Sequence, residues 1–267
     1  MSHVCVIELF VLLTIGLLAG LLAGLFGIGG GLVIVPALVW WLRAQGAPLE
    51  WAMPIAVASA LGSMLLTSAS SAFAHARKQH LDWSTTLRLA ASLALGALLG
   101  AWLAVRLPGQ WLAWIFALFA AWVGVRMLLG SVEQRHVKRP AKARYWWLFG
   151  PLMGAASAMV GIGGASFNVP YLTRNGFTTL QAVAVAAACG WLLALAGSVG
   201  FLLQDAAGMA WPRTIGYWYW PAVLTIGLGG LLMAPVGAAL AHRLGSARLA
   251  RGFGAVLLLV AVRMAMQ

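Results

Sequence analysis

Acidic side chains are nearly absent from this 267-residue sequence, and charged residues of either sign are few. Five Asp and Glu residues stand against 17 Lys and Arg residues, and charged side chains make up 8% of the chain. Soluble domains have roughly a quarter of their residues charged. Because so few charged side chains cannot cover a water-exposed surface, the composition excludes a soluble globular protein and indicates a membrane protein.

Residues for a disulfide framework, a metal site or a catalytic centre are also few and scattered. The two cysteines, Cys5 and Cys189, lie far apart in apolar segments, and the five histidines show no ligand spacing. An enzyme would need a nucleophile, paired carboxylates or a metal cluster, and the five acidic residues are dispersed along the chain. We therefore expect no metal, no cofactor and no enzymatic activity.

Hydrophobic residues, by contrast, make up 63% of the chain and form a series of apolar runs, with tryptophans near their ends. A membrane-spanning helix needs about 20 apolar residues, so this chain has room for roughly eight spans and short loops. Tryptophan is typical of membrane interfaces. The sequence thus predicts an all-α polytopic membrane protein in a lipid bilayer, with apolar segments at about 4–26, 30–42, 52–74, 84–105, 110–130, 146–160, 164–173, 179–203, 217–241 and 249–266.

Eleven of the 17 basic residues lie in three short stretches between apolar runs, at 75–88, 133–144 and 242–251. In a soluble protein a formal charge of +12 would suggest nucleic acid as a partner. Between membrane spans, however, lysine and arginine mark the loops that stay in the cytoplasm. We therefore expect no nucleic-acid partner, and we expect all three stretches to face the cytoplasm.

The two halves of the chain resemble each other around a Gly-Ile-Gly-Gly motif. Residues 20–38 read GLLAGLFGIGGGLVIVPAL and residues 154–172 read GAASAMVGIGGASFNVPYL, with eight of the 19 aligned positions identical. Two further matches follow in the same order, 56–61 with 184–189 and 125–127 with 262–264. The sequence therefore predicts two homologous transmembrane repeats, at 1–131 and 146–267, joined by a basic cytoplasmic linker at 132–145.

Charge counting favours an inverted relation between the repeats. If all three basic stretches face the cytoplasm, the chain must cross the membrane an even number of times between the second and the third. Each motif-bearing stretch then counts as two passes, each half has five, and the halves are inverted. Segments 30–42 and 164–173 are too short to span the membrane alone at about 1.5 Å per residue. The alternative is that each motif-bearing stretch crosses the membrane once as one long segment, which makes the repeats parallel.

Each motif predicts a helix that is broken near the middle of the membrane. Glycine destabilises a helix interior by about 1 kcal/mol, and proline removes a backbone hydrogen bond. A helix that begins at such a break presents bare N–H groups and a positive dipole end, which together form a binding site for an anion. The candidate substrate-binding residues at the two breaks are Gly27, Gly29, Gly30, Gly31, Pro36, Gly161, Gly163, Gly164 and Pro170.

Glycines at four-residue spacing elsewhere favour a different interpretation. Gly16, Gly20 and Gly24 form small-xxx-small steps, as do Gly96 and Gly100, and this spacing is typical of close helix contacts in membranes. We predict packing at these positions. For the motif glycines, close packing is the alternative to a role in substrate binding.

Polar side chains within the apolar runs supply further candidates, each with a structural alternative. Ser59 and Ser63 share a helix face and either bind substrate or bond back to their own helix. Arg126 and Arg263 occupy equivalent positions and either attract anions or extend to the membrane interface. Two polar residues directly after the second motif complete the substrate-binding candidates: Ser166 and Asn168.

The segments GLFGIGGGLVIVPAL and GIGGASFNVPYL, the AVASAL segment, the basic HARKQHLDW loop and the duplication resemble the sulfite exporter TauE/SafE family. The resemblance covers essentially the whole chain. It implies a multi-pass secondary transporter of the bacterial inner membrane, with sulfite or another sulfur-containing or organic anion as its substrate. The family commonly has Thr-Ser where this chain has Ser59-Ala60, so the resemblance does not fix sulfite as its anion.

We therefore predict a secondary transporter or exporter of a small anion. The identity of the anion, the direction of transport, a coupling proton or sodium ion and assembly into homo-oligomers are left open by the sequence. The alternative is a non-transporting membrane scaffold or a channel-like protein, which an open pore through the midplane, or no cavity at all, would favour.

Overall fold

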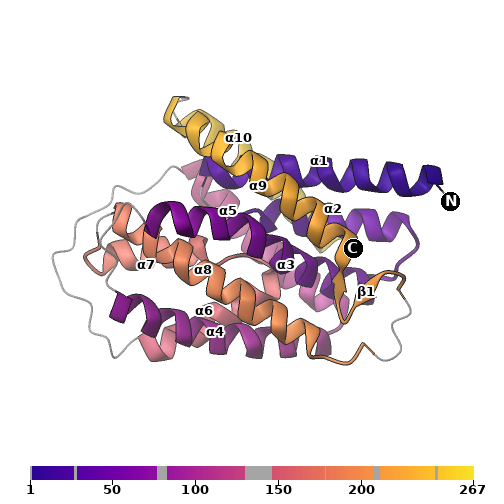
Figure 1. Cartoon of the computed structure of the whole chain (residues 1–267), viewed down its shortest axis with the longest axis horizontal. Coiled ribbons are helices and arrows are strands. Elements are labelled where there is room, and N and C mark those ends of the chain that lie inside the picture. The colour runs from indigo at the N-terminus through magenta and orange to yellow at the C-terminus, as the bar shows by residue number, and fades with distance from the viewer. Residues whose placement is uncertain are drawn as a thin grey trace.

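The computed structural model describes residues 2–26, 29–76, 83–129, 146–177, 179–206, 211–243 and 246–267, and most of them are helical (Figure 1). The predicted linker at 132–145 lies outside the described residues. In chain order the elements are α1 (Ser2–Phe26), α2 (Gly31–Ala44), α3 (Leu49–Ala76), α4 (Trp83–Arg106), α5 (Gly109–Leu129), α6 (Trp146–Val160), α7 (Ala165–Arg174), α8 (Thr179–Leu202), β1 (Thr214–Ile215), β2 (Trp218–Tyr219), α9 (Trp220–Arg243) and α10 (Ser246–Ala265).

Six of the described helices, α1, α3, α4, α5, α8 and α9, are long and apolar enough to cross a membrane. Large apolar side chains are exposed on the outside of the bundle; Leu118 of α5 is 75% exposed and Leu232 of α9 is 66% exposed. Such a surface would be a liability in water but matches lipid. The prediction of an all-α polytopic membrane protein is therefore confirmed.

Glycines bring helices of the two halves into backbone contact. In α1, a Cβ added at Gly20 would lie 2.6 Å from the Cα atom of Gly230 in α9. In α4, a Cβ added at Gly96 would overlap the backbone of Pro151 in α6. The small-xxx-small steps thus serve close packing, as predicted, and they join α1 to α9 and α4 to α6.

The equivalent helices α5 and α10 pack against each other in opposite directions. A Cβ at Gly124 of α5 would lie 3.2 Å from Cγ of Leu258 in α10, whereas a Cβ at Gly254 would lie 3.3 Å from Cγ of Leu128. A residue later in α5 therefore contacts a residue earlier in α10, so the two helices are antiparallel.

The central helices α3 and α8, which carry the matching segments 56–61 and 184–189, form a second antiparallel pair. Trp191 of α8 donates a hydrogen bond from Nε1 to the carbonyl oxygen of Leu65 in α3, at 3.2 Å. Further along α8, a Cβ at Gly197 would lie 2.9 Å from Leu61, which is earlier in α3. Both helices are largely buried, so this pair forms the core of the bundle.

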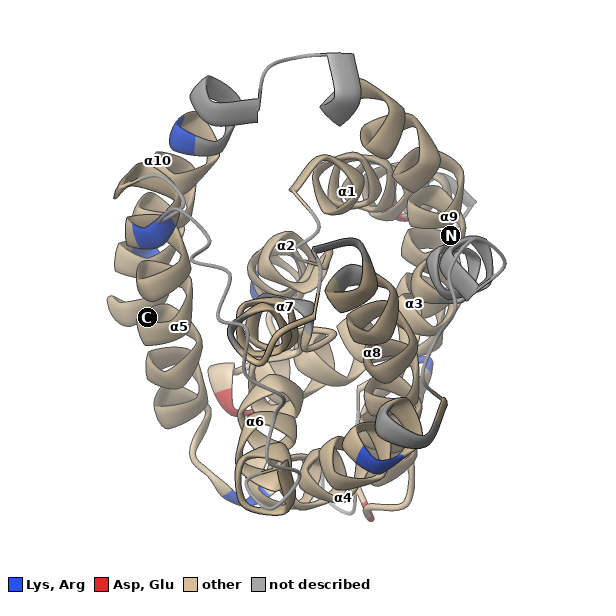
Figure 2. Ribbon diagram, turned by 90° about the vertical axis from the view of Figure 1, so that its left-hand side faces the viewer, with Lys and Arg blue, Asp and Glu red and all other residues tan. Residues whose placement is uncertain are grey.

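The helix ends that flank the three basic stretches lie at one end of the bundle. Helices α3 and α9 run in the same direction. Gly62 of α3 contacts Val223 of α9, and further along both helices Leu66 of α3 contacts Gly227 of α9. Helices α4 and α6 are likewise parallel. The ends of α3, α5 and α9 and the starts of α4, α6 and α10 therefore gather at the end that faces the viewer in Figure 2.

Candidate functional site

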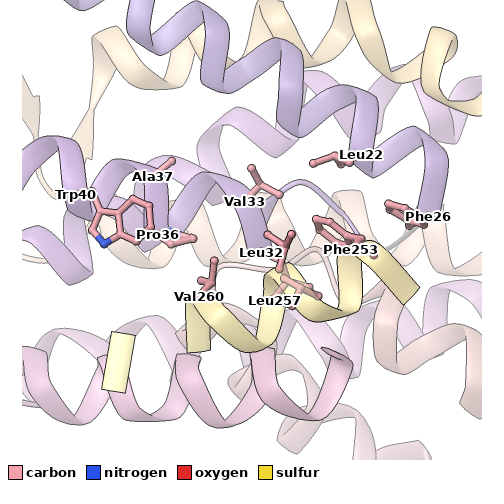
Figure 3. Close-up of a pocket in the computed structure, with 12 residues that line it drawn as sticks. Leu22, Phe26, Leu32, Val33, Pro36, Ala37, Trp40, Phe253, Leu257 and Val260 are labelled. Carbon is pink, nitrogen blue, oxygen red and sulfur yellow. The ribbon is translucent and has the colours of Figure 1, made fainter. Parts of the chain in front are cut away.

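Both Gly-Ile-Gly-Gly motifs interrupt a helix, as predicted. Helix α1 ends at Phe26 and α2 begins at Gly31, whereas α6 ends at Val160 and α7 begins at Ala165. The labelled residues of α1 and α2 in Figure 3 run in opposite directions, so the chain turns back at the first motif. Gly27, one of the predicted site residues, lies outside the described residues.

Left-handed glycines shape the second break. Gly161 has a φ of 74° and its N–H donates to the carbonyl oxygen of Ala158, while the N–H of Ile162 donates to that of Ser157. This pair of bonds is the Schellman motif, in which the left-handed position favours glycine. Gly164 precedes α7 and is also left-handed, with a φ of 70°. The glycines of this motif therefore set the sharp end of α6 and the start of α7.

The two motifs, far apart in the sequence, meet each other in the structure. A Cβ added at Gly31 would overlap the carbonyl oxygen of Gly161, and one added at Gly29 would lie 3.7 Å from the nitrogen of Gly163. Met64 of α3 lies against both motifs, 2.9 Å from a Cβ at Gly31 and 3.5 Å from one at Gly163. The structure thus brings six of the nine motif candidates together in one place: Gly29, Gly30, Gly31, Gly161, Gly163 and Gly164.

Helices α2 and α7 both begin at this place, and neither has a side-chain cap. The carbonyl oxygen of Gly30 accepts from the N–H groups of Val33 and Ile34, and that of Gly164 accepts in the same way from Phe167 and Asn168. The N–H groups before these residues have no partner within the helices. With the helix dipoles, they give the site a positive potential without a charged side chain.

Unpaired polar side chains surround Gly164. Asn168 is 1% exposed and Ser157 is fully buried, and neither the amide of Asn168 nor Oγ of Ser157 has a hydrogen-bond partner in the structure. A Cβ at Gly164 would lie 3.2 Å from Nδ2 of Asn168 and 3.7 Å from Oγ of Ser157. Because buried polar atoms are almost always hydrogen-bonded, these groups are candidates for contacts with a polar ligand. Ser166, also predicted, lies in the first turn of α7.

Ser59 and Ser63 are buried in α3, but their hydroxyl groups have structural partners. Ser63 donates from Oγ to the carbonyl oxygen of Ser59 at 2.8 Å, and Oγ of Ser59 accepts from the backbone N–H of Tyr219 at 3.0 Å. The first bond is the back-bonding alternative that the sequence left open. Ser59 holds the end of β2 against α3.

The two arginine candidates do not converge on one site. Arg126 and Arg263 lie in the last turns of α5 and α10 and are exposed. Because these helices are antiparallel, the two side chains lie at opposite ends of the bundle. The guanidinium of Arg126 lies 5.0 Å from the ring centroid of Trp122, in cation–π geometry.

The prolines lie inside the short helices rather than at the breaks. Pro36 is buried in α2 and lines a cavity beside α10, while Pro170 lies at the matching position of α7. Each removes one hydrogen bond from a helix that is already short. The prolines therefore weaken α2 and α7 close to where these helices begin.

Sequence reasoning missed an ion pair that joins α1 to the strand pair before α9. Glu8 is 4% exposed; it accepts a hydrogen bond from the hydroxyl of Tyr219 and pairs with Arg213 at 2.9 Å. Arg213 has a left-handed backbone, with a φ of 62°, which is uncommon for a residue other than glycine. No local sequence signal connects residues so far apart. Among the described residues, no group of His, Cys, Asp and Glu could hold a metal ion.

An apolar helical bundle interrupted near its centre by two facing helix breaks is the architecture of a polytopic membrane transporter. Comparison with known proteins agrees. The family described as "Sulfite exporter TauE/SafE" matches residues 12–264, and the chain belongs to this family.

Three relatives illustrate the similarity, and each carries the description "Probable membrane transporter protein". The chain is 34% identical to one from Haemophilus influenzae over 253 residues, which covers 94% of this chain and 96% of the relative. It is 25% identical to one from Methanocaldococcus jannaschii, covering 81% and 80%, and 26% identical to one from Bacillus subtilis, covering 88% and 75%. No solved structure matches the chain significantly. The chain is therefore a membrane transporter and not an enzyme.

Proposed function

We propose that this transporter carries a small anion, with sulfite or another sulfur-containing or organic anion as its substrate, and that the anion binds where the two motifs meet. The observation that carries the proposal is the combination of two uncapped helix starts with the buried, unpaired amide of Asn168. Backbone N–H groups and an amide bind an anion without a fixed positive charge. Such a site holds the anion weakly enough to release it on the other side.

We infer that the two halves are inverted repeats in the bacterial inner membrane. The antiparallel pairing of α5 with α10 and of α3 with α8 supports this, because a two-fold axis in the membrane plane reverses equivalent helices. The common end of the three basic stretches supports it too, since that end then faces the cytoplasm. The repeats would rock around the motif site and expose it alternately to each side.

The test is transport by purified protein in proteoliposomes, with sulfite, thiosulfate and sulfoacetate as substrates. Gly163→Ala is the variant of choice, because the nearest atom to a Cβ there is Sδ of Met64 at 3.5 Å, an ordinary contact. The methyl group should lower transport at least about tenfold, equivalent to ~1.4 kcal/mol of binding, while the melting temperature stays unchanged. The proposal fails if none of these anions moves, or if Gly163→Ala transports normally.

The same vesicles distinguish a carrier from a channel and identify the coupling ion. A carrier exchanges labelled substrate against an unlabelled internal pool, whereas an open pore lets the pool leak away. Imposed proton and sodium gradients, applied separately, show which of the two drives accumulation. Leakage without exchange would favour the channel-like alternative.

A further inference from the structure

An apolar groove of about 560 Å³ lies between α1, α2 and α10, outside the motif site (Figure 3). Figure 3 shows Phe26 and Phe253 toward one end and Trp40 at the other. Trp40 and Val256 are exposed, so the groove opens on the surface that faces lipid. Its lining is Leu22, Phe26, Leu32, Val33, Pro36, Ala37, Trp40, Gly252, Phe253, Val256, Leu257 and Val260.

The groove is elongated, and an aromatic pair lies toward one of its ends. The rings of Phe26 and Phe253 stack with centroids 4.9 Å apart and an interplanar angle of 12°. From Leu32 to Trp40 the wall formed by α2 extends about 12 Å, at about 1.5 Å per residue. An elongated apolar groove that opens on the lipid-facing surface and has an aromatic pair toward one end fits a single hydrocarbon chain.

The equivalent place, between α5 and α7, is filled by the protein itself. The alignment of the repeats puts Phe167 opposite Val33 and Phe119 opposite Val256. Phe119 and Phe167 pack with ring centroids 4.7 Å apart, and Trp122 stacks on Phe167 at 5.6 Å. The groove has valines, Val33 of α2 and Val256 of α10, at the positions of these two phenylalanines, so it is present at one of the two equivalent interfaces and is not a general gap between helices.

Two arginines lie beyond the open end of the groove. Arg43 follows Trp40 by three residues on α2, and Arg263 follows Val260 by three residues on α10, so each continues the same helix face by about one turn. Both are exposed. Helices α2 and α10 both end away from the basic stretches, at the end where tryptophan marks the interface. A positive charge at this depth attracts a lipid phosphate.

We propose that this groove binds one acyl chain of an anionic phospholipid, whose phosphate lies against Arg43 and Arg263. With the basic stretches in the cytoplasm, the lipid belongs to the outward-facing leaflet. The chain fills the slot down to the pair formed by Phe26 and Phe253. Because Leu32 and Pro36 form part of the wall, the lipid braces α2 directly after the first helix break.

Filling the groove tests the proposal. Gly252 lines it, and a Cβ there would meet no atom within 4 Å. Gly252→Leu therefore starts a side chain in open space beside the groove, and leucine is a better helix former than glycine. The matched control is Ala255→Leu, an exposed position on the same helix that does not line the groove. Native mass spectrometry of delipidated protein titrated with phosphatidylglycerol or phosphatidylcholine counts the lipids retained.

Wild type and Ala255→Leu should each retain one phosphatidylglycerol, and Gly252→Leu should bind it at least about tenfold more weakly, because the leucine displaces two or more methylene groups. Arg43→Gln and Arg263→Gln should each reduce the preference for phosphatidylglycerol over phosphatidylcholine about fivefold. Equal retention of phosphatidylglycerol by wild type and Gly252→Leu would overturn the proposal. A dimer that forms without lipid and that Gly252→Leu abolishes would also overturn it, because a second copy of the chain would then occupy the groove. Val256→Phe, which introduces the residue found at Phe119, provides a second filling variant.

Discussion

Gly31 and Gly161 touch across the centre of the molecule, each from the helix break of its own repeat. A Cβ on Gly31 would overlap the carbonyl oxygen of Gly161 and would lie 2.9 Å from Cε of Met64. A backbone oxygen cannot move aside as the end of a flexible side chain can. Glycine at position 31 is therefore required for the two motifs to meet, and this contact joins the repeats where we propose that the anion binds.

Gly31→Ala should consequently destabilise the protein and reduce transport together. Overpacking of this kind costs typically about 1–3 kcal/mol, which thermal unfolding in detergent measures as a lower melting temperature. The control is Gly252→Ala, where the added methyl group meets open space and helix propensity predicts a gain of up to about 1 kcal/mol. If Gly31→Ala were as stable and active as wild type, the two motifs could not be in contact.

Asn168→Leu should change stability and transport in opposite directions. Its amide is buried without a partner, and such a group costs about 1–3 kcal/mol, so leucine should raise the melting temperature. Loss of the amide should nevertheless abolish anion transport in proteoliposomes. A variant that is more stable and fully active would show that Asn168 does not contact the substrate.

Ser198→Ala is the matched control for that experiment. Ser198 is a buried hydroxyl on α8, also without a partner. It lies about 12 Å along the helix, at about 1.5 Å per residue, from Gly190, where an added Cβ would lie 2.5 Å from the carbonyl oxygen of Gly163. The alanine variant should gain stability and keep full transport.

The sequence sufficed for features that depend on local chemistry. Low charge and long apolar runs predicted the membrane helices, because lipid leaves few alternatives for a polypeptide backbone. Clustered glycine followed by Pro36 or Pro170 predicted the two helix breaks, because both residue types disfavour helix wherever they occur. The spacing of Gly16, Gly20 and Gly24 predicted close packing for a similar reason.

Features that depend on the path of the chain could not be predicted. Ser59 accepts a hydrogen bond from Tyr219, and nothing near either residue in the sequence indicates that partner. Arg126 and Arg263 match in the alignment, which suggested one shared role, but antiparallel helices carry them to opposite ends of the bundle. Equivalence in sequence therefore does not imply proximity when the equivalent helices pack antiparallel.

Substitutions of Glu8 and of Arg213, the two partners of the ion pair, should lower stability by unequal amounts. Removing Arg213 leaves a buried carboxylate with the hydroxyl of Tyr219, whereas Glu8→Gln removes the charge itself. Because Arg213 is partly exposed, we expect Arg213→Gln to lower stability by about 1–2 kcal/mol and Glu8→Gln by less. The double variant should be more stable than Arg213→Gln alone. Additive losses in thermal unfolding would show that the two side chains do not interact.

The inverted relation that we propose for the repeats predicts opposite labelling of two equivalent turns. Helices α2 and α7 are each followed by a turn with a left-handed glycine, Gly46 after α2 and Gly176 after α7, each with a φ of 92°. In a variant without the native cysteines, Gln45→Cys should react with a membrane-impermeant maleimide from outside the cell, and Asn175→Cys only after the cytoplasmic side is opened. Pro108→Cys, in the exposed turn between α4 and α5, should label from the same side as Gln45→Cys and serves as the control. Labelling of positions 45 and 175 from one side would require parallel repeats, and the two helix starts could then not form one site reached alternately from both sides of the membrane.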